Sequence, residues 1–307
     1  MLGLSQRKMH LSDTHHPVWR SLLFVPANNP KFIEKAYTRG ADGIILDLED
    51  SVPEAELDVA RAALRDAAAS VSRNGADVLV RINNPDDQAA ADIEAAVFPG
   101  VKALFLPKAR DADHVRDISA QIAKCESAEG MAPGAVRLAP MIETADAYFK
   151  AVEIGRADPR NVAMNLGGED FAMDVGMVPG ADTLAMPKQH IIIAARAAGL
   201  MPMGLMGTVA DFGDLDGIRL AAETARRFGI DGASCIHPSN VAILNAAFTP
   251  NPAEVDHAER AISAYAKATR TGSGAITVDG KMIDVPVVQR AEKLLARWRA
   301  IQARDAG

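Results

Sequence analysis

Short, nearly uninterrupted apolar runs recur eight times before Pro250, and segments with helical spacing or turn residues separate them. Such runs are typical of parallel strands buried on both faces. Eight strand-then-helix units predict an α/β fold of the (β/α)8 TIM-barrel type. A doubly wound sheet is the alternative, although no G-x-G-x-x-G follows the first run. The predicted strands are residues 20–26, 43–50, 77–83, 101–106, 136–142, 162–166, 201–206 and 232–236.

Polar and charged residues follow most of these runs. In a TIM barrel the active site lies at the carboxyl ends of the strands, so side chains at the ends of several strands meet at one rim. Ions at the ends of five strands are hard to explain as loop polarity alone. The polar and charged residues at the ends of the predicted strands are Asn28, Glu49, Asp50, Arg81, Lys108, Glu143, Glu169, Asp170 and His237.

The stretch from Asn161 to Gly176 concentrates this pattern. A strand at residues 162–166 runs into two glycines and then into Glu169 and Asp170. Glycines let the backbone approach a ligand closely, and paired acids at the end of a buried strand indicate a ligand or a metal. The alternative is structural, with Asp170 as the N-cap of a helix that begins near Phe171.

Glu143 and Asp170 end neighbouring predicted strands. Two carboxylates in such positions suit a hard divalent cation, and Mg2+ in particular takes one or two protein carboxylates together with water and substrate. No His pair or Cys cluster lies near them, which argues against zinc or iron. The alternative is that Glu143 pairs with Arg81 or Lys108 in a structural network.

The cations at the predicted rim have two interpretations each. Arg81 offers a planar fork for a carboxylate, a phosphate or a developing oxyanion, or it pairs with Glu49 or Asp50. Lys108 could form a Schiff base with a keto substrate, but a positioning or ion-pair role is favoured. His237 precedes a proline, which favours a packed histidine that positions the strand-to-helix turn over a catalytic base.

The chain divides into a tail at residues 1–18, a barrel at residues 19–250, and a C-terminal lid or oligomerisation extension at residues 251–307. The extension reads as a helix–hairpin–helix, with the hairpin turning on Asp279-Gly280. Asp284 precedes the last helix and fits an N-cap followed by an early proline. Its alternative role is a general acid/base that closes over the rim.

The composition of the chain argues against two classes of partner, nucleic acids and membranes. A formal net charge of -7 without a dense Lys/Arg run argues against nucleic-acid binding, and no apolar stretch is long enough to span a membrane. Cys125 and Cys235 have no metal-binding or redox spacing. They are expected to be free thiols in a reducing cytoplasm, with Cys235 packed in the core.

Several motifs together resemble the citrate lyase beta-subunit-like (CitE-like) family of the HpcH/HpaI aldolase/citrate lyase superfamily. The resemblance extends from Arg20 to the last helix. The motifs are Arg20-Ser-Leu-Leu-Phe-Val-Pro26, Leu46-Asp-Leu-Glu-Asp-Ser-Val-Pro53, Val80-Arg-Ile-Asn83, Leu106-Pro-Lys108, Met141-Ile-Glu-Thr144, Gly167-Gly-Glu-Asp170, Cys235-Ile-His-Pro-Ser239 and Gly280-Lys-Met-Ile-Asp284.

The resemblance implies a (β/α)8 barrel that assembles as a homotrimer or a hexamer and binds Mg2+ and an acyl-coenzyme A. Glu143 and Asp170 would hold the metal, and Arg81 would contact the substrate and stabilise a thioester enolate. Lys31 would help to hold the coenzyme. Asp284 matches an acid/base carboxylate supplied to a neighbouring subunit's site.

The implied reaction is Mg2+-dependent cleavage or formation of a carbon–carbon bond in a 3-hydroxyacyl-CoA such as malyl-, citramalyl- or citryl-CoA, with acetyl-CoA and a 2-keto acid as products. A malyl-CoA thioesterase and the citryl-CoA lyase subunit of a citrate lyase complex are the alternatives. A non-catalytic acyl-CoA-binding subunit is a further alternative. Departures such as Ala27 and Met186-Pro-Lys188 concern coenzyme binding and the acyl group, not the acid pair.

Overall fold

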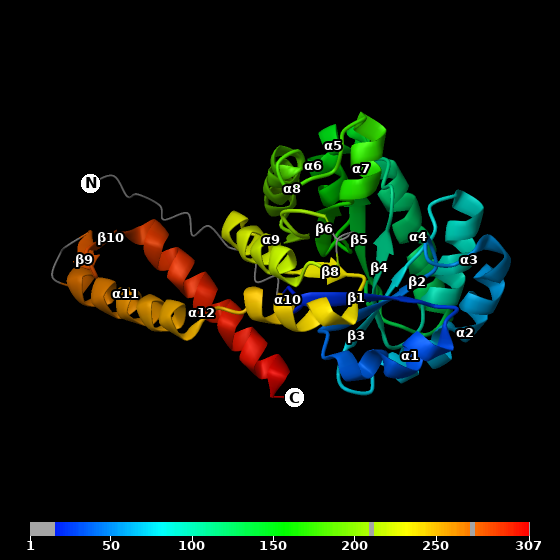
Figure 1. The fold of residues 1–307 in the computed structure, drawn as a ribbon, viewed down its shortest axis with the longest axis horizontal. Coiled ribbons are helices and arrows are strands. Elements are labelled where there is room, and N and C mark those ends of the chain that lie inside the picture. The colour runs from blue at the N-terminus through cyan, green and yellow to red at the C-terminus, as the bar shows by residue number, and fades with distance from the viewer. Residues whose placement is uncertain (1–15, 209–211, 271–273, 307) are drawn as a thin grey trace, which may run out of the picture.

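A computed structural model describes residues 16–208, 212–270 and 274–306, so most of the predicted tail lies outside the described residues. Eight parallel strands form the centre of the molecule, surrounded by helices (Figure 1). All eight overlap the predicted strands. They are β1 (Ser21–Pro26), β2 (Gly43–Asp47), β3 (Asp77–Arg81), β4 (Val101–Leu106), β5 (Arg137–Ile142), β6 (Ala163–Leu166), β7 (Met201–Met203) and β8 (Ala233–Cys235).

The strand order follows the chain from β1 to β7, and β8 pairs with β1. A parallel bridge between Met203 and Gly232 joins β7 to β8 and closes the ring. Two backbone hydrogen bonds support this seam, from Gly204 N–H to the Gly232 carbonyl (2.9 Å) and from Asp231 N–H to the Pro202 carbonyl (3.1 Å). The predicted TIM barrel is therefore confirmed, and the doubly wound alternative is wrong.

Alternate residues of the strands face opposite sides, which explains why the runs are apolar at consecutive positions. One set, including Leu22, Ile45, Leu79 and Phe105, forms a buried cluster of its own. The other set, including Ile44, belongs to a larger cluster shared with the helices. The barrel interior is thus a packed core below the rim.

Ten helices in the described residues belong to the barrel part, and none of the described helices is long and apolar enough to cross a membrane. Pro187 falls in the first turn of the helix that begins at Ala185, where a missing N–H is tolerated. The helices are α1 (Pro30–Ala36), α2 (Leu57–Val71), α3 (Asp86–Ala96), α4 (Ala112–Ala128), α5 (Ala145–Phe149), α6 (Ala151–Arg156), α7 (Gly168–Val175), α8 (Ala185–Ala198), α9 (Leu215–Phe228) and α10 (Val241–Ala247).

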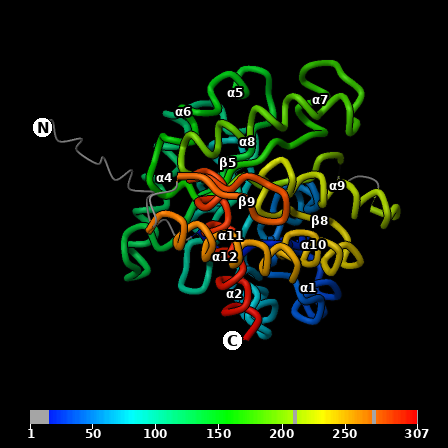
Figure 2. The backbone as a smooth tube through the Cα atoms, turned by 90° about the vertical axis from the view of Figure 1, so that its left-hand side faces the viewer, coloured from blue at the N-terminus to red at the C-terminus, as the bar shows by residue number. Residues whose placement is uncertain are grey.

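The C-terminal extension projects from the barrel (Figure 1), and in the view of Figure 2 it lies in front of the barrel. It consists of α11 (Pro252–Arg270), a hairpin of β9 (Ile276–Val278) and β10 (Lys281–Ile283), and α12 (Val285–Asp305), as predicted. Both turn residues of the hairpin have positive φ, 50° for Asp279 and 73° for Gly280, which explains the Asp-Gly sequence.

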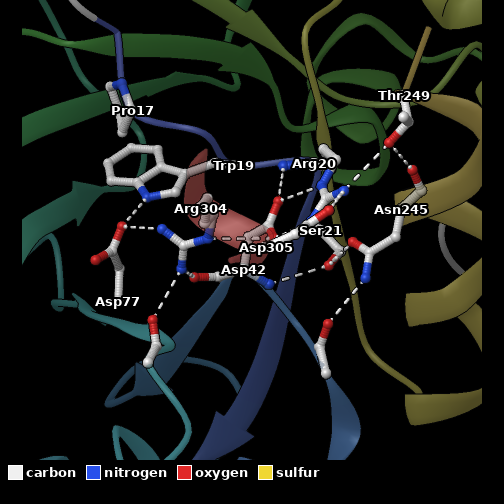
Figure 3. A network of polar contacts seen from close by, with 12 residues as sticks. Pro17, Trp19, Arg20, Ser21, Asp42, Asp77, Asn245, Thr249, Arg304 and Asp305 are labelled. Carbon is white, nitrogen blue, oxygen red and sulfur yellow. Dashed lines mark hydrogen bonds and ion pairs between the residues drawn. The ribbon is translucent and has the colours of Figure 1, made fainter. Parts of the chain in front are cut away.

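The C-terminal end of α12 is docked on the barrel by a network of ions (Figure 3). Arg304 contacts Asp42 and Asp77, and Asp305 pairs with Arg20 at 2.6 Å. Arg20, Asp42 and Asp77 all lie at or just before the amino ends of β1 to β3. The extension is therefore attached at the barrel face opposite the carboxyl ends of the strands.

Replacing Asp42 by alanine is expected to lower the free energy of unfolding by about 3–5 kcal/mol, because it leaves the buried guanidinium of Arg20 without its main partner. Asp42 accepts hydrogen bonds from the backbone N–H, Nε and Nη2 of Arg20 at 2.7–2.9 Å. Asp305→Ala is the matched control: Asp305 is half-exposed, so the loss should stay near or below about 1 kcal/mol. Urea denaturation of both variants measures the difference, and equal losses would contradict it.

Candidate active site at the mouth of the barrel

A cavity of about 900 Å3 opens at the carboxyl ends of the barrel strands. Most of the polar and charged residues predicted at the rim line this cavity. Asn28 does not, and donates to Glu56 instead. Glu49 and Lys108 are joined to the lining residues by ion pairs. The predicted residues that line the cavity are Lys31, Asp50, Arg81, Glu143, Glu169, Asp170 and His237.

Glu143 follows β5 and is 3% exposed. Its Oε2 accepts the backbone N–H of Lys108 at 2.6 Å. Its Oε1 lies so close to Gly167 that a Cβ there would be 2.2 Å away, so any other residue at this point of the β6–α7 turn would displace the Glu143 side chain. Burial raises the pKa of the Glu143 carboxyl to about 7, and the negative charges of Glu49 and Asp170 add to this effect.

Glu169 and Asp170 lie in the first turn of α7, which begins at Gly168 with Gly167 as its N-cap. The interpretation of Asp170 as the N-cap of a helix beginning near Phe171 is therefore wrong. Asp170 lines the cavity, and its Oδ1 lies 3.8 Å from Lys108 Nζ. The two acids are held at the rim by the start of a helix, a position that favours negative charge.

Arg81 ends β3 and is engaged by three acids. Its guanidinium donates to both carboxylate oxygens of Asp47 at 2.6 and 2.8 Å, and it pairs with Glu49 and Asp50 at 2.9 and 3.0 Å. Burial alone would lower the pKa of Arg81, but the hydrogen bonds and charge of Asp47 raise it. The predicted ion pairs of Arg81 with Glu49 and Asp50 are therefore confirmed. Arg81 also lines the cavity, and its guanidinium lies over the Phe24 ring.

Lys108 takes the ion-pair position that the sequence favoured. Its Nζ lies 2.8 Å from Glu49 Oε1. Burial lowers its pKa, yet the hydrogen bond and charge of Glu49 raise it overall. A raised pKa keeps the amine protonated, which opposes a nucleophilic Schiff-base role.

Three cations of α1 and the 3-10 turn after it line one side of the cavity. Lys31 was predicted, and Lys35 and Arg39 were not. They are four residues apart, so they fall on one helix face, which is a signal that the sequence does carry. A face of this kind suits phosphate groups.

Lys188, noted in the sequence only as part of Met186-Pro-Lys188, is a buried lysine of α8 that lines the cavity. Its Nζ donates to the carbonyl oxygens of Leu205 and Gly207 after β7. Burial lowers the pKa of Lys188 to about 8. The sequence does carry one sign that Lys188 is buried: its spacing from Leu184 and Ile191 puts it on the apolar face of a helix.

The depressed pKa of Lys188 makes stability depend on pH. An unfolded lysine titrates near ~10.4. Between about pH 8 and that value the unfolded chain therefore binds more protons, and stability rises with pH. Urea denaturation of the wild type should show a gain of up to about 3 kcal/mol over this window relative to Lys188→Met, which lacks the group. Identical pH profiles for the two proteins would contradict this.

His237 and Cys235 have the structural roles predicted for them, a turn-positioning histidine and a core thiol. His237 Nδ1 accepts the Ser239 N–H and caps the short 3-10 turn that starts at Pro238, so it positions the turn after β8. Cys235 is buried, and burial raises the pKa of its thiol to about 12. A thiol of this kind is inert at neutral pH.

Asp284 is the N-cap of α12, where its Oδ1 accepts the Val287 N–H at 3.2 Å. It is not among the residues that line the cavity of its own chain. It directly follows β10, and β10 lies at the end of the extension that is remote from the barrel (Figure 1). With about 30 Å of helix between it and the docked end of α12, Asp284 serves its own chain as a cap.

The donor set at the rim fits a hard divalent cation. Glu143 is a buried carboxyl with a raised pKa, pressed against Gly167, and Asp170 is near a single lysine. Within the described residues no three His, Cys, Asp or Glu side chains form a ready-made cage. Mg2+ needs none, because it commonly uses one or two carboxylates and completes its shell with water and substrate.

A closed parallel barrel with ions gathered in a cavity at the carboxyl ends of its strands is the architecture of a TIM-barrel enzyme. Residues 20–238 match the family described as HpcH/HpaI aldolase/citrate lyase. This chain belongs to that family. The membership confirms the resemblance and the expected lyase class.

Three relatives illustrate the likeness. The citrate lyase subunit beta of Leuconostoc mesenteroides subsp. cremoris is 33% identical over 90% of this chain and 92% of its own length. A (3S)-malyl-CoA thioesterase of Cereibacter sphaeroides is 36% identical over 94% and 97%. The solved structure of CitE from Mycobacterium tuberculosis with magnesium, acetoacetate and coenzyme A is 32% identical, with a TM-score of 0.71 over 91% of this chain and 97% of that chain.

Proposed function

We propose that this protein is a Mg2+-dependent carbon–carbon lyase that cleaves or forms a 3-hydroxyacyl-CoA thioester such as malyl-, citramalyl- or citryl-CoA. The observation that carries the proposal is the pair of carboxylates, Glu143 and Asp170, on the wall of one cavity at the barrel rim. The magnesium and coenzyme A in the related CitE structure support the same ligands here.

Each charged group has a role in this reaction. Glu143 and Asp170 hold the cation, which when bound supplies Lewis acidity toward the oxygens of the 2-keto acid. Arg81 is positioned by Asp47 and offsets negative charge that develops on the thioester oxygen. Lys31 contributes to coenzyme binding from the mouth of the cavity.

Asp284 completes the site as the general acid/base that exchanges the proton at the acetyl methyl group. Because it lies far from its own cavity, it acts on the site of a neighbouring subunit in a homotrimer or hexamer. Residues 251–307 then form an oligomerisation extension on the barrel of residues 19–250. Both cysteines are unpaired, which supports a reducing compartment such as the cytoplasm.

A panel of malyl-, citramalyl- and citryl-CoA tests the function, with and without Mg2+. Acetyl-CoA and a 2-keto acid should appear only with Mg2+, and turnover that survives excess chelator would reject the proposal. The likeness to (3S)-malyl-CoA thioesterases favours a second candidate, which would release free CoA instead of acetyl-CoA. A citryl-CoA lyase subunit is a third, favoured by the likeness to citrate lyase subunit beta, and it would co-purify with an acyl-carrier protein.

A further inference from the structure

Lys108 has an unusual backbone. Its φ of 46° is in the left-handed region, and Asp279 is the other non-glycine residue with positive φ among the described residues. Such a conformation is uncommon outside glycine and strained for a residue with a long side chain. Asn84 donates to the carbonyl oxygens of Pro107 and Lys108 and helps to hold it.

The conformation gives Lys108 two contacts with the acid cluster. Its backbone N–H donates to Glu143 Oε2 at 2.6 Å, while its Nζ lies 2.8 Å from Glu49 Oε1 and 3.8 Å from Asp170 Oδ1. One residue therefore orients the first of the two proposed metal ligands through its backbone and approaches the second with a positive charge.

The ammonium group of Lys108 offsets negative charge at this edge of the cavity. Three carboxylates, Glu49, Glu143 and Asp170, meet at this edge of the cavity. Glu49 shares Arg81 with Asp47 and Asp50, whereas Lys108 is the cation recorded beside Asp170 within the described residues. Carboxylates this close repel one another unless a cation lies among them.

We propose that Lys108 is a positioning residue with a built-in counterion: its backbone fixes Glu143, and its ammonium balances Glu49 and Asp170 until a divalent cation takes that role. The inference rests on the proposed function, because it assigns Mg2+ to Glu143 and Asp170. The side chain of Lys108 is 37% exposed, so it has room to turn from Asp170 while it keeps Glu49.

The prediction is that the charge of Lys108 opposes metal binding. In Lys108→Met the left-handed backbone and its N–H toward Glu143 are kept in place by Asn84, and the charge is gone. Mg2+ should then bind about tenfold more tightly, because the positive charge that competes with it at Asp170 is removed. Lys108→Gly should do the same without backbone strain.

Lys108→Arg keeps the charge and should keep the wild-type affinity. Lys102→Met, at an exposed position of β4, controls for the loss of a lysine elsewhere. Isothermal titration with Mg2+, and electron paramagnetic resonance with Mn2+, measure affinity without any substrate. A second readout is the rise in melting temperature on adding Mg2+, which should be larger in Lys108→Met than in the wild type.

The outcomes separate the two proposals. If the wild type binds Mg2+ and the methionine and glycine variants bind it no more tightly, the counterion role is overturned and the proposed function stands. If the arginine variant also tightens binding, charge is not the cause and the counterion role is again overturned. If the wild type binds no Mg2+, both proposals are overturned.

Discussion

Replacing Glu143 by glutamine should lower kcat/KM for the acyl-CoA substrate by at least about a thousandfold, because the Lewis acidity of the cation is worth several kcal/mol and each ~1.4 kcal/mol is tenfold in rate. Glutamine keeps the size of the side chain beside Gly167 and removes one of the two carboxylates. Asp170→Asn should act in the same way. Steady-state kinetics at saturating Mg2+ measure the loss.

Glu153→Gln is the matched control, since Glu153 is an exposed acid of α6 away from the cavity. It should keep wild-type kinetics. Mn2+ titration followed by electron paramagnetic resonance should show weakened binding for Glu143→Gln and unchanged binding for the control. A Glu143→Gln protein with wild-type turnover would remove the metal pair from the reaction.

Replacing Asp284 by asparagine should lower kcat by about 10²–10⁴-fold, the usual contribution of a general acid/base, and leave Mg2+ affinity unchanged. Asparagine is the right variant, because it caps a helix nearly as well as aspartate and so preserves the start of α12. Single-turnover kinetics with one acyl-CoA substrate measure the effect. Unchanged turnover would show that Asp284 is only a cap.

A mixing experiment tests whether Asp284 acts on a neighbour. Asp284→Asn and Glu143→Gln proteins are each nearly inactive alone. When they are refolded together, about a quarter of the sites combine an intact metal pair with a neighbour's intact Asp284, and activity should return to about that level. No recovery, with mixed oligomers demonstrated by two different affinity tags, would place Asp284 outside the neighbour's site.

The barrel could be predicted because its signal is local. Apolar runs and the segments between them revealed all eight strands, and errors were confined to the ends. The runs predicted to reach Asp50, Asn83 and Met206 leave the sheet earlier, because β2, β3 and β7 end at residues 47, 81 and 203. The hairpin was found because the backbone needs Asp279-Gly280 at its turn. These features depend on residues close together in the sequence.

The contacts that were not predicted join residues far apart in the sequence. Asp47, the main partner of Arg81, is 34 residues away and looked like part of a strand. Lys188 was noted only as part of Met186-Pro-Lys188, and the pair between Arg20 and Asp305, at the opposite face of the barrel, spans nearly the whole chain. The left-handed backbone of Lys108 leaves no mark in the sequence, because lysine has no preference for it.

The seam of the barrel has a consequence for its motion. A single bridge and two hydrogen bonds join β7 to β8, whereas β1 and β2 pair over five residues. Fewer bonds allow opening at a smaller free energy, so the amides of Gly204 and Asp231 should exchange with deuterium sooner than those of β2. The seam between β7 and β8 is therefore the part of the barrel wall that we expect to open most readily in solution.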